Sequence, residues 1–459
     1  MITNKPSESY LSHLYWLLSG TIALTTAFLL TNLGRMMTIS MVGHLGTEEL
    51  AGMSVAQMLD DCSFFCILIG VTTTLDTLCG QSWTGSKDKT TIGLHLQRGI
   101  CIYGVLFFPI AIFWSVCLIM LQGTGFMGPN ELHYASVYLC FMIPSCLAFG
   151  IYYMLGAYLR AQGIMRIATY SALIVFPMTV ITNYAFISGN PFSWGIAGAG
   201  LAGAVTSITV CGFNIGYIYW IAGSEGWGGW TRDCLHEWLP AVKLLIPSTF
   251  LVLVEIVVPR LCSLAASRFG SAALGAHFIL LNTNATCISF ALSLKQIMLT
   301  RISNLMGKGA LADTKRSIIV GNSLALITGL ASAIPLLACR FVYPSLFTKD
   351  ETMAHIVSES LPLLALIQVL GTFHYNQVGI AYGLGRQRQT SYIIFVSYVL
   401  ISLPCCYFFA FPMGWSVYGL WIGNAIAEFF AGVFLFLYLN TLDLQEEAQR
   451  IMNQIFKEK

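Results

Sequence analysis

Glu255 is the residue of this sequence whose type and position most clearly indicate chemistry. It lies within the apolar stretch 247–261 and 13 residues before Arg268. A helix rises about 1.5 Å per residue, so the carboxyl would lie roughly 20 Å from that charged end. A charge surrounded by hydrocarbon costs at least about 2.5–3.5 kcal/mol and is therefore rare unless it serves a function. Glu255 is accordingly the first candidate for binding a proton or another cation.

The residues around Glu255 favour such a site. Pro259 follows four residues later, and because proline has no N–H it leaves the Glu255 carbonyl without its helical hydrogen bond and predicts a kink. Asn282 and Asn284 in the next apolar stretch fall at a similar depth and could complete the site. Burial of a carboxyl favours its protonated form, which suits proton exchange. The structural alternative is a carboxyl held permanently by a neighbour.

Other polar side chains interrupt apolar stretches and are candidates for a substrate cavity. They are Arg35, Asp60, Asp61, Asn183, Tyr184, Lys295, His374, Asn376, Gln377 and Glu428. Arg35 lies at a depth comparable to that of the two aspartates, so it could form an ion pair between helices, and such a pair could be purely structural. Asp76 lies nearer a helix end, where an anchoring role is expected. Lys295 has a stem long enough to carry its charge toward the interface.

The sequence offers no constellation for enzymatic, metal or nucleic-acid chemistry. Most of the 14 cysteines lie inside apolar stretches and form no spaced ligand set. The glycine-containing segment 80–87 has lysine and serine in the wrong order for a phosphate-binding loop. The net charge is +2, without a basic block. We therefore expect no enzyme activity, no cofactor, no bound metal and no nucleic-acid partner.

Composition indicates the elements that must hold these residues. The chain has 459 residues, of which 56% are hydrophobic and only 10% charged, whereas soluble domains have about 25% charged residues. A helix crosses hydrocarbon with roughly 20 apolar residues. The sequence predicts an all-α membrane protein with about twelve spans, near 15–43, 50–80, 98–122, 132–160, 165–187, 195–222, 240–267, 272–300, 316–346, 353–384, 390–412 and 416–441.

The distribution of lysine and arginine predicts the orientation in the bilayer. With both termini in the cytoplasm, seventeen of these residues fall in the inner segments and four in the outer segments. Inner loops are enriched in positive residues, so we expect cytoplasmic termini. A plasma membrane or a vacuolar-type membrane would suit this protein.

The two halves of the sequence resemble each other. LGTEELAG (45–52) is similar to FGSAALGA (269–276) at a lag of 224, and the stretches that begin at Trp194 and Trp415 match at a lag of 221. Ordered matches favour an internal duplication, with the solvent path between the halves. We expect an N-terminal six-helix lobe (1–222), a cytoplasmic linker (223–239), a C-terminal six-helix lobe (240–441) and a cytoplasmic tail (442–459).

Four motifs resemble the MATE (multidrug and toxic compound extrusion) family, in particular its eukaryotic branch. They are MVGHLGTEELAG (41–52), LDTLCGQSW (75–83), LRAQG (159–163) and TRISNLMGKG (300–309). The resemblance implies two six-helix bundles around a V-shaped central cavity. It also implies a coupling glutamate at Glu255. The sequence departs from the family where a second glutamate and two aspartates are common, with Arg260, Gly371 and Thr38 at those positions.

Together these features predict a secondary antiporter that exports small organic solutes, organic cations or xenobiotics, in exchange for protons. Without an ATP site, coupling has to come from an ion gradient. Two alternatives stay open: an exporter coupled to sodium, and a flippase for lipids or lipid-linked molecules. The expected partners are the solute, protons or sodium and the bilayer, and we expect a monomer.

Overall fold

Within the described part of the chain, twelve helices are long and apolar enough to cross a membrane, as the sequence predicts. The computed structural model describes residues 8–124, 128–188, 193–348 and 350–457, and these contain helices but no strands. Helices suit hydrocarbon because all their backbone hydrogen bonds close within the segment. The spans run in chain order through α1 (Tyr10–Gly43), α2 (Thr47–Asp60) with η1 (Asp61–Phe65) and α3 (Cys66–Gly85), α4 (Thr91–Thr124), α5 (Pro129–Ala161), α6 (Arg166–Asn183) with η2 (Tyr184–Ser188), α7 (Gly195–Trp220), α8 (Leu239–Ala266), α9 (Ser271–Gly307), α10 (Leu311–Ala338), α11 (Glu351–Gly383), α12 (Gln387–Phe395) with η7 (Val396–Ser402) and α13 (Leu403–Ala410), and α14 (Ser416–Asn440).

One predicted span is too long. The apolar run 316–346 predicts a single helix, but α10 ends at Ala338 and the chain then forms the 3₁₀ turn η6 (Tyr343–Leu346). Pro344 occupies the start of that turn, where its missing N–H and fixed φ are tolerated. Hydropathy alone cannot separate an apolar loop from the end of a helix.

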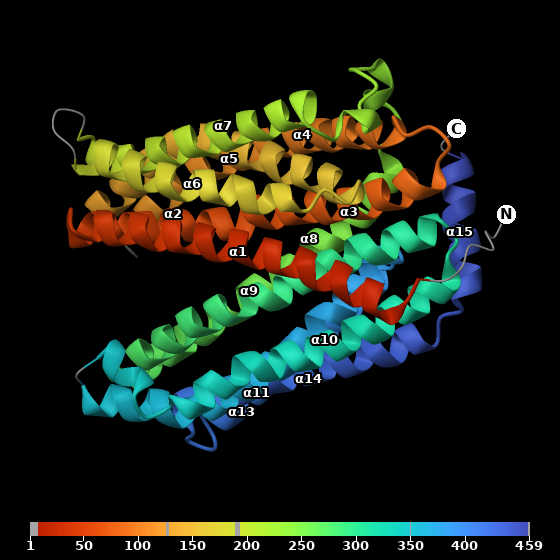
Figure 1. Cartoon of the computed structure of the whole chain (residues 1–459). Helices are drawn as coiled ribbons and strands as arrows, with labels where there is room; N and C mark the ends of the chain where they lie inside the picture. Colours follow the sequence, from red (N-terminus) through yellow and green to blue (C-terminus); the bar gives the residue numbers. More distant parts are fainter. Residues whose placement is uncertain (1–7, 125–127, 189–192, 349, 458–459) are drawn as a thin grey trace. The chain divides into compact units, whose positions relative to one another are not determined.

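The described chain packs as two compact units. One unit contains Thr26–Trp83 and Lys87–Thr249, and the other contains the first part of α1, Thr84–Ser86 and the chain from Phe250 onward. In this second unit α11 lies beside α9, α10 and α14 (Figure 1). The segment predicted as the linker packs within the first unit, where it forms two 3₁₀ turns, η3 (Ser224–Gly226) and η4 (Arg232–Leu235).

Small residues set the close approach of helices in both units. A Cβ on Gly200 of α7 would lie 2.8 Å from the Cβ of Phe141 on α5, and a Cβ on Gly423 of α14 would lie 2.2 Å from the Cys406 sulfur on α13. Helices in membranes associate through this kind of packing, since lipid tails exert no hydrophobic force between them. The Gly/Ala stripes of α7 and α14 are therefore packing faces.

A buried ion pair joins α3 to α5. The Arg160 guanidinium donates two hydrogen bonds of 3.0 Å to the two carboxylate oxygens of Asp76. The Asp76 side chain is fully buried and that of Arg160 is 10% exposed. Asp76 therefore joins two helices from the middle of α3, whereas the sequence predicts a helix-end or loop-anchoring role for it.

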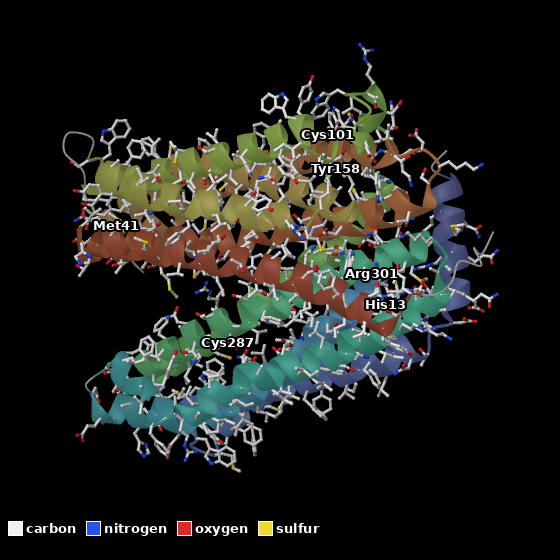
Figure 2. All side chains as sticks on the ribbon, viewed as in Figure 1. His13, Met41, Cys101, Tyr158, Cys287 and Arg301 are labelled. Carbon is white, nitrogen blue, oxygen red and sulfur yellow. The ribbon has the colours of Figure 1, made fainter. Side chains whose placement is uncertain are left out.

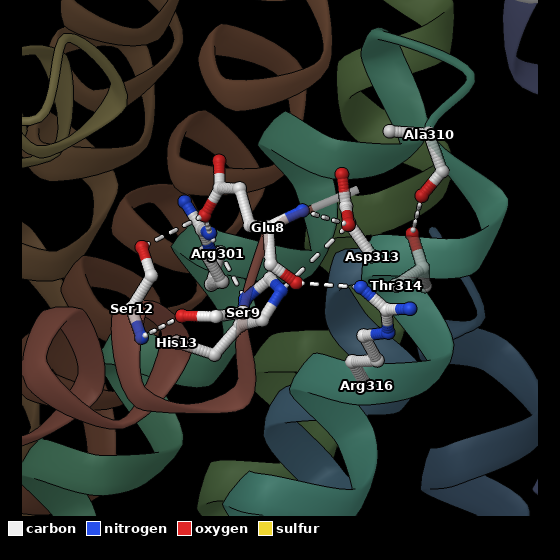
Figure 3. Close-up of polar contacts among 9 residues, drawn as sticks. All are labelled: Glu8, Ser9, Ser12, His13, Arg301, Ala310, Asp313, Thr314 and Arg316. Carbon is white, nitrogen blue, oxygen red and sulfur yellow. Dashed lines mark hydrogen bonds and ion pairs between the residues drawn. The ribbon is translucent and has the colours of Figure 1, made fainter. Parts of the chain in front are cut away.

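A polar cluster at the start of α1 fastens this helix to α9 and α10 (Figure 3). The Glu8 amide donates to Asp313, its carbonyl accepts from Arg316, and its carboxylate contacts Arg301. Arg301 also donates to Nδ1 of His13 at 3.0 Å, and Figure 2 shows these two side chains together. Partial burial by itself would raise the pKa of the Glu8 carboxyl. The charge of Arg301 and its hydrogen bond outweigh that effect, so the pKa lies below its ordinary value.

An amphipathic helix follows the last span. The helix α15 (Leu444–Lys457) places Glu447 between Arg386 and Arg450, and the Arg450 guanidinium donates to the Leu384 carbonyl at 2.6 Å. The hydrogen bonds that Arg386 donates to the Glu447 carboxylate raise the pKa of Arg386. The described part of the predicted tail is thus a helix anchored to the turn between α11 and α12.

Replacing Asp76 by alanine would leave the Arg160 charge buried without its carboxylate. Breaking one partner of a buried pair typically costs about 3–5 kcal/mol, so we expect a clear drop in the melting temperature in detergent. The exposed Glu225 provides the matched control, because Glu225→Ala should change stability by no more than about 0.5 kcal/mol. Equal melting temperatures for both variants would contradict the structural role of the pair.

The Glu8 contacts predict a dependence on pH. Because the folded pKa of Glu8 is lowered, its stabilising effect is present above the ordinary value of 4.5 and is lost as the pH falls through the folded pKa. At pH 7 the first turns of α1 should exchange amide hydrogens faster in Glu8→Gln than in the wild type, and this difference should vanish in acid. A difference that stays constant from neutral pH to pH 3 would argue against the contact.

Candidate functional site

Glu255 lies on α8 with one carboxylate oxygen buried and without a hydrogen-bond partner among the described residues. The helix continues through Pro259 to Ala266. The Glu255 carboxyl interacts electrostatically with Lys295 of α9, His374 of α11 and Glu428 of α14. Four helices thus bring together two carboxyls, an ammonium and an imidazole, which we call the Glu255 cluster.

The hydrogen bonds of the cluster leave its two acids in different situations. Glu428 is only 5% exposed, accepts a hydrogen bond of 2.8 Å from the Tyr398 hydroxyl, and lies 2.8 Å from Nδ1 of His374. The other nitrogen of His374 is buried and has no partner among the described residues. Glu428 is therefore held in place, whereas Glu255 keeps an oxygen available for a proton or a cation.

Lys295 is held by an aromatic ring as well as by charge. Its side chain is 5% exposed, and its ammonium lies 5.2 Å from the centre of the Tyr375 ring. Such a position stabilises a cation through the ring quadrupole. The expectation that Lys295 carries its charge toward the interface is therefore at odds with its burial beside Tyr375.

Gly371 leaves space that Glu428 uses. A Cβ built on Gly371 would lie 3.4 Å from the Glu428 carboxylate. Where the family resemblance implies an aspartate on this span, the chain has no side chain, and an acid from α14 reaches the same region. Although that aspartate is absent, Glu255 and Glu428 still give the cluster two carboxyls.

The amides predicted near Glu255 form separate contacts. Asn282 is exposed and donates to the Phe278 carbonyl of its own helix, and Asn284 accepts from Gln368. Neither bond reaches Glu255. Further along α11, Asn376 and Gln377 both donate to the side chain of Asn322 on α10. These two bonds are 2.7 and 2.8 Å long.

A second polar site is a cavity of about 230 Å³ in the other unit. Among its lining residues are Arg35, Asp60, Asp61 and Asn183, together with the aromatic rings of Tyr138, Phe149 and Tyr152. Asp60 has a buried oxygen without a partner among the described residues and interacts electrostatically with Asp61 and Arg35. The Asn183 amide donates to the Thr38 hydroxyl at 2.6 Å. We call this site the Asp60 cavity.

Tyr184 lies apart from the candidate residues that line the Asp60 cavity. Its side chain is 67% exposed and it lies outside the lining of the Asp60 cavity. Asn183, the preceding residue, is 1% exposed and faces the cavity. The side chains of these two neighbouring residues therefore point in different directions, at the position where α6 ends and the π-helical turn η2 begins.

Sequence reasoning missed Tyr398 and Asn322. Asn322 is a polar residue within a predicted span and could have been singled out on that ground. Tyr398 gives no such signal, because tyrosine is common in apolar stretches. No group of three or more potential metal ligands occurs in the described parts of the chain.

Comparison with known proteins identifies relatives of both halves. The family model MatE matches residues 23–185 and again residues 247–408. The two matches begin 224 residues apart, which equals the lag of the repeat at 45–52 and 269–276. An uncharacterised transporter of Schizosaccharomyces pombe is 31% identical over 455 residues, which cover 96% of this chain and 83% of the relative.

Named relatives and solved structures agree with this match. Multidrug and toxin extrusion protein 1 of Danio rerio is 25% identical, with 89% of this chain and 69% of that protein covered. Protein DETOXIFICATION 15 of Arabidopsis thaliana is 26% identical, with 91% and 85% covered. The crystal structure of the eukaryotic MATE transporter AtDTX14 superposes with a TM-score of 0.87 at 20% identity and covers 97% of this chain and 99% of its own. A variant of the Vibrio cholerae MATE transporter VcmN gives a TM-score of 0.85 at 17% identity, with 95% and 99% covered.

Tyr398→Phe removes the hydroxyl that donates to Glu428 and leaves a buried carboxylate oxygen short of a hydrogen bond. We expect a loss of about 1–3 kcal/mol in the free energy of unfolding. Tyr392 is the matched control, since it is 57% exposed and Tyr392→Phe should have little effect. Denaturation of both variants in the same detergent measures the difference, and equal midpoints would contradict the role given to Tyr398.

Proposed function

Because the chain belongs to the MATE family of multidrug and toxin efflux transporters, we propose that it exports small organic solutes in exchange for protons and that Glu255 is the coupling group. It is a multi-pass integral membrane protein and not an enzyme. Antiport, the proton as coupling ion and the organic cation as substrate are the proposed parts of this function.

The observation that carries the proposal is the partly unsatisfied carboxyl of Glu255 beside a buried cation and a second acid. With Lys295 charged, His374 neutral and both glutamates ionised, the cluster would have a net charge of −1. One proton on Glu255 brings it to zero. Because a net charge in a low-dielectric interior is costly, gain or loss of this proton favours different packing of the helices around it.

Coupling follows if the proton and the solute favour different conformations. A ligand shifts an equilibrium between two states only by its difference in affinity for them. A proton that neutralises Glu255 favours the state in which the cluster is most enclosed. The ionised carboxyl favours a state in which water or a cation can reach it, and alternation between the two states moves solute outward.

The Asp60 cavity supports an organic cation as the substrate. It combines two acidic side chains, Asp60 and Asp61, with one basic side chain, Arg35, and aromatic rings form part of its wall. An ammonium group would interact with the free oxygen of Asp60 while its apolar part contacts the rings. The volume of about 230 Å³ suits a small solute or one end of a larger one.

The remaining expectations form part of the same proposal. Residues 1–222 and 240–441 would be the two lobes, with 223–239 as a cytoplasmic linker and 442–459 as a cytoplasmic tail. Positive residues favour cytoplasmic termini in a plasma or vacuolar-type membrane, and a monomer would suffice for transport. The flippase alternative has less support, because Lys295 is buried and both Lys295 and Arg35 interact electrostatically with carboxylates.

Flux measurements in proteoliposomes test the coupling. Efflux of ethidium, a fluorescent organic cation, should accelerate under an imposed pH gradient in the wild type. In Glu255→Gln this acceleration should fall by at least about tenfold, because the amide cannot carry the proton, while the melting temperature stays close to that of the wild type.

The matched control is Glu359→Gln, whose side chain is 64% exposed on α11 and whose flux should equal that of the wild type. A sodium gradient at uniform pH provides the other arm. Acceleration by sodium but not by the pH gradient would reject the proton as coupling ion, and unchanged efflux by Glu255→Gln would reject the role of that residue.

A further inference from the structure

Two cysteines meet where the segment between α7 and α8 crosses α4. The sulfur of Cys101, in the third turn of α4, lies 3.9 Å from the sulfur of Cys234 in the 3₁₀ turn η4. Cys234 is 7% exposed and Cys101 is partly exposed. We propose that Cys101 and Cys234 form a reversible disulfide that fastens this connecting segment to α4. The proposal is independent of the transported solute.

The segment already lies on one face of α4. The Gln97 side chain donates to the Gly229 carbonyl at 2.6 Å and accepts from the Thr231 amide at 3.1 Å. The next residue, Arg98, bonds Glu237 at 3.1 Å. Gln97 and Cys101 are four residues apart and therefore neighbours on the helix surface. These bonds place Cys234 opposite Cys101, so that only a local shift separates the two thiols from bonding distance.

Closing the bond requires a short local shift of the backbone around Cys234. A disulfide has its sulfurs about 2.05 Å apart, so closure needs an approach of about 2 Å. The turn η4 has only four residues and is followed by Glu237, whose φ is 58°, a value that is strained for a residue with a side chain. Gly229, with a φ of 86°, lies on its other side. A short turn between two such positions adjusts more easily than a long helix.

A second pair of thiols provides an internal comparison. The sulfurs of Cys262 on α8 and Cys406 on α13 lie 4.0 Å apart, nearly the same distance. Both residues belong to spanning helices and are 8% and 3% exposed. The Cys406 sulfur is also packed against Gly423, where even a Cβ would lie 2.2 Å away. Because neither helix can shift independently and aqueous oxidants are excluded, this pair should stay reduced.

The chemistry balances with hydrogen peroxide as the oxidant. The Cys101 thiolate attacks one peroxide oxygen, the O–O bond breaks, and the products are a sulfenic acid and hydroxide, which takes up the thiol proton to become water. The Cys234 thiolate then attacks the sulfenic sulfur and displaces the second hydroxide, which takes up the other thiol proton. Two thiols lose two electrons and two protons, and one peroxide becomes two waters. A reducing dithiol reverses the bond by exchange.

Fastening the segment would restrict the connection between the two predicted lobes. Hydrogen bonds, the Arg98–Glu237 ion pair and the apolar packing of Trp227 and Trp238 hold it, and each of these can open separately. A covalent bond removes that freedom. Oxidation on this side of the membrane, which the positive residues predict to be cytoplasmic, would then alter the transporter at residues outside the Glu255 cluster.

Peptide mapping of the full chain in nanodiscs tests the proposal. The protein is titrated with hydrogen peroxide, free thiols are blocked with a maleimide, and the digest is analysed by mass spectrometry. We expect a peptide pair linked through Cys101 and Cys234 that dithiothreitol separates. Amide exchange of residues 227–238 should slow several-fold when the link forms. Cys101→Ser and Cys234→Ser should abolish both effects, whereas Cys262→Ser should leave them intact.

The exposed Cys339 reports that the oxidant has acted. Oxidation of Cys339 without any Cys101–Cys234 link would overturn the proposal. Preferential linkage of Cys262 to Cys406 would overturn the argument from local mobility. A link that leaves the exchange of residues 227–238 unchanged would show that the disulfide does not fasten the segment, and would equally reject the inference.

Discussion

Hydrocarbon supplies no hydrogen bonds, and this constraint accounts for most of the arrangement described above. Every polar group within a span has to find a partner inside the protein or remain unsatisfied at a substantial free-energy cost. Many of these groups are hydrogen-bonded within the protein. Asp76 bonds Arg160, Glu428 bonds His374 and Tyr398, and the side-chain amides of α11 bond Asn322. Among the carboxylates of the described chain, Glu255 and Asp60 each keep a buried oxygen without a hydrogen-bond partner, and they mark the two candidate sites.

Interrupted helices accompany both sites. The π-helical turns η1 and η2 begin next to Asp60 and Asn183, which line the Asp60 cavity, and η7 carries Tyr398, which bonds Glu428. A π-helical turn inserts an extra residue into the helical ladder and is frequent at functional sites. In each case the turn changes which side chains face inward. The same elements therefore loosen the regular helix and supply the polar groups, which links the local backbone to the proposed transport chemistry.

Close packing distinguishes groups that can react from groups that are only near one another. Cys262 and Cys406 are as close as Cys101 and Cys234, but the first pair is enclosed by spanning helices and the second includes a short turn. Likewise, Glu428 and Glu255 are both acids of one cluster, but the first is held by two hydrogen bonds. A short distance alone does not decide whether two groups react. The freedom of the surrounding backbone and the available hydrogen-bond partners decide it.

The amino-acid sequence by itself determined the class of fold and the twelve spans, and it singled out Glu255 as a candidate functional residue. These follow from the length of apolar stretches and the rarity of charges within them, which are local properties. Which side chains surround Glu255 was not predictable, because Lys295, His374 and Glu428 come from three other helices whose rotation about their axes depends on packing. For the same reason Asn282 appeared close by depth but is exposed, Tyr184 lies outside the cavity, and Glu428 reaches the space left by Gly371. Depth along a helix can be read from sequence, whereas the direction in which a side chain points is decided only when the helices pack.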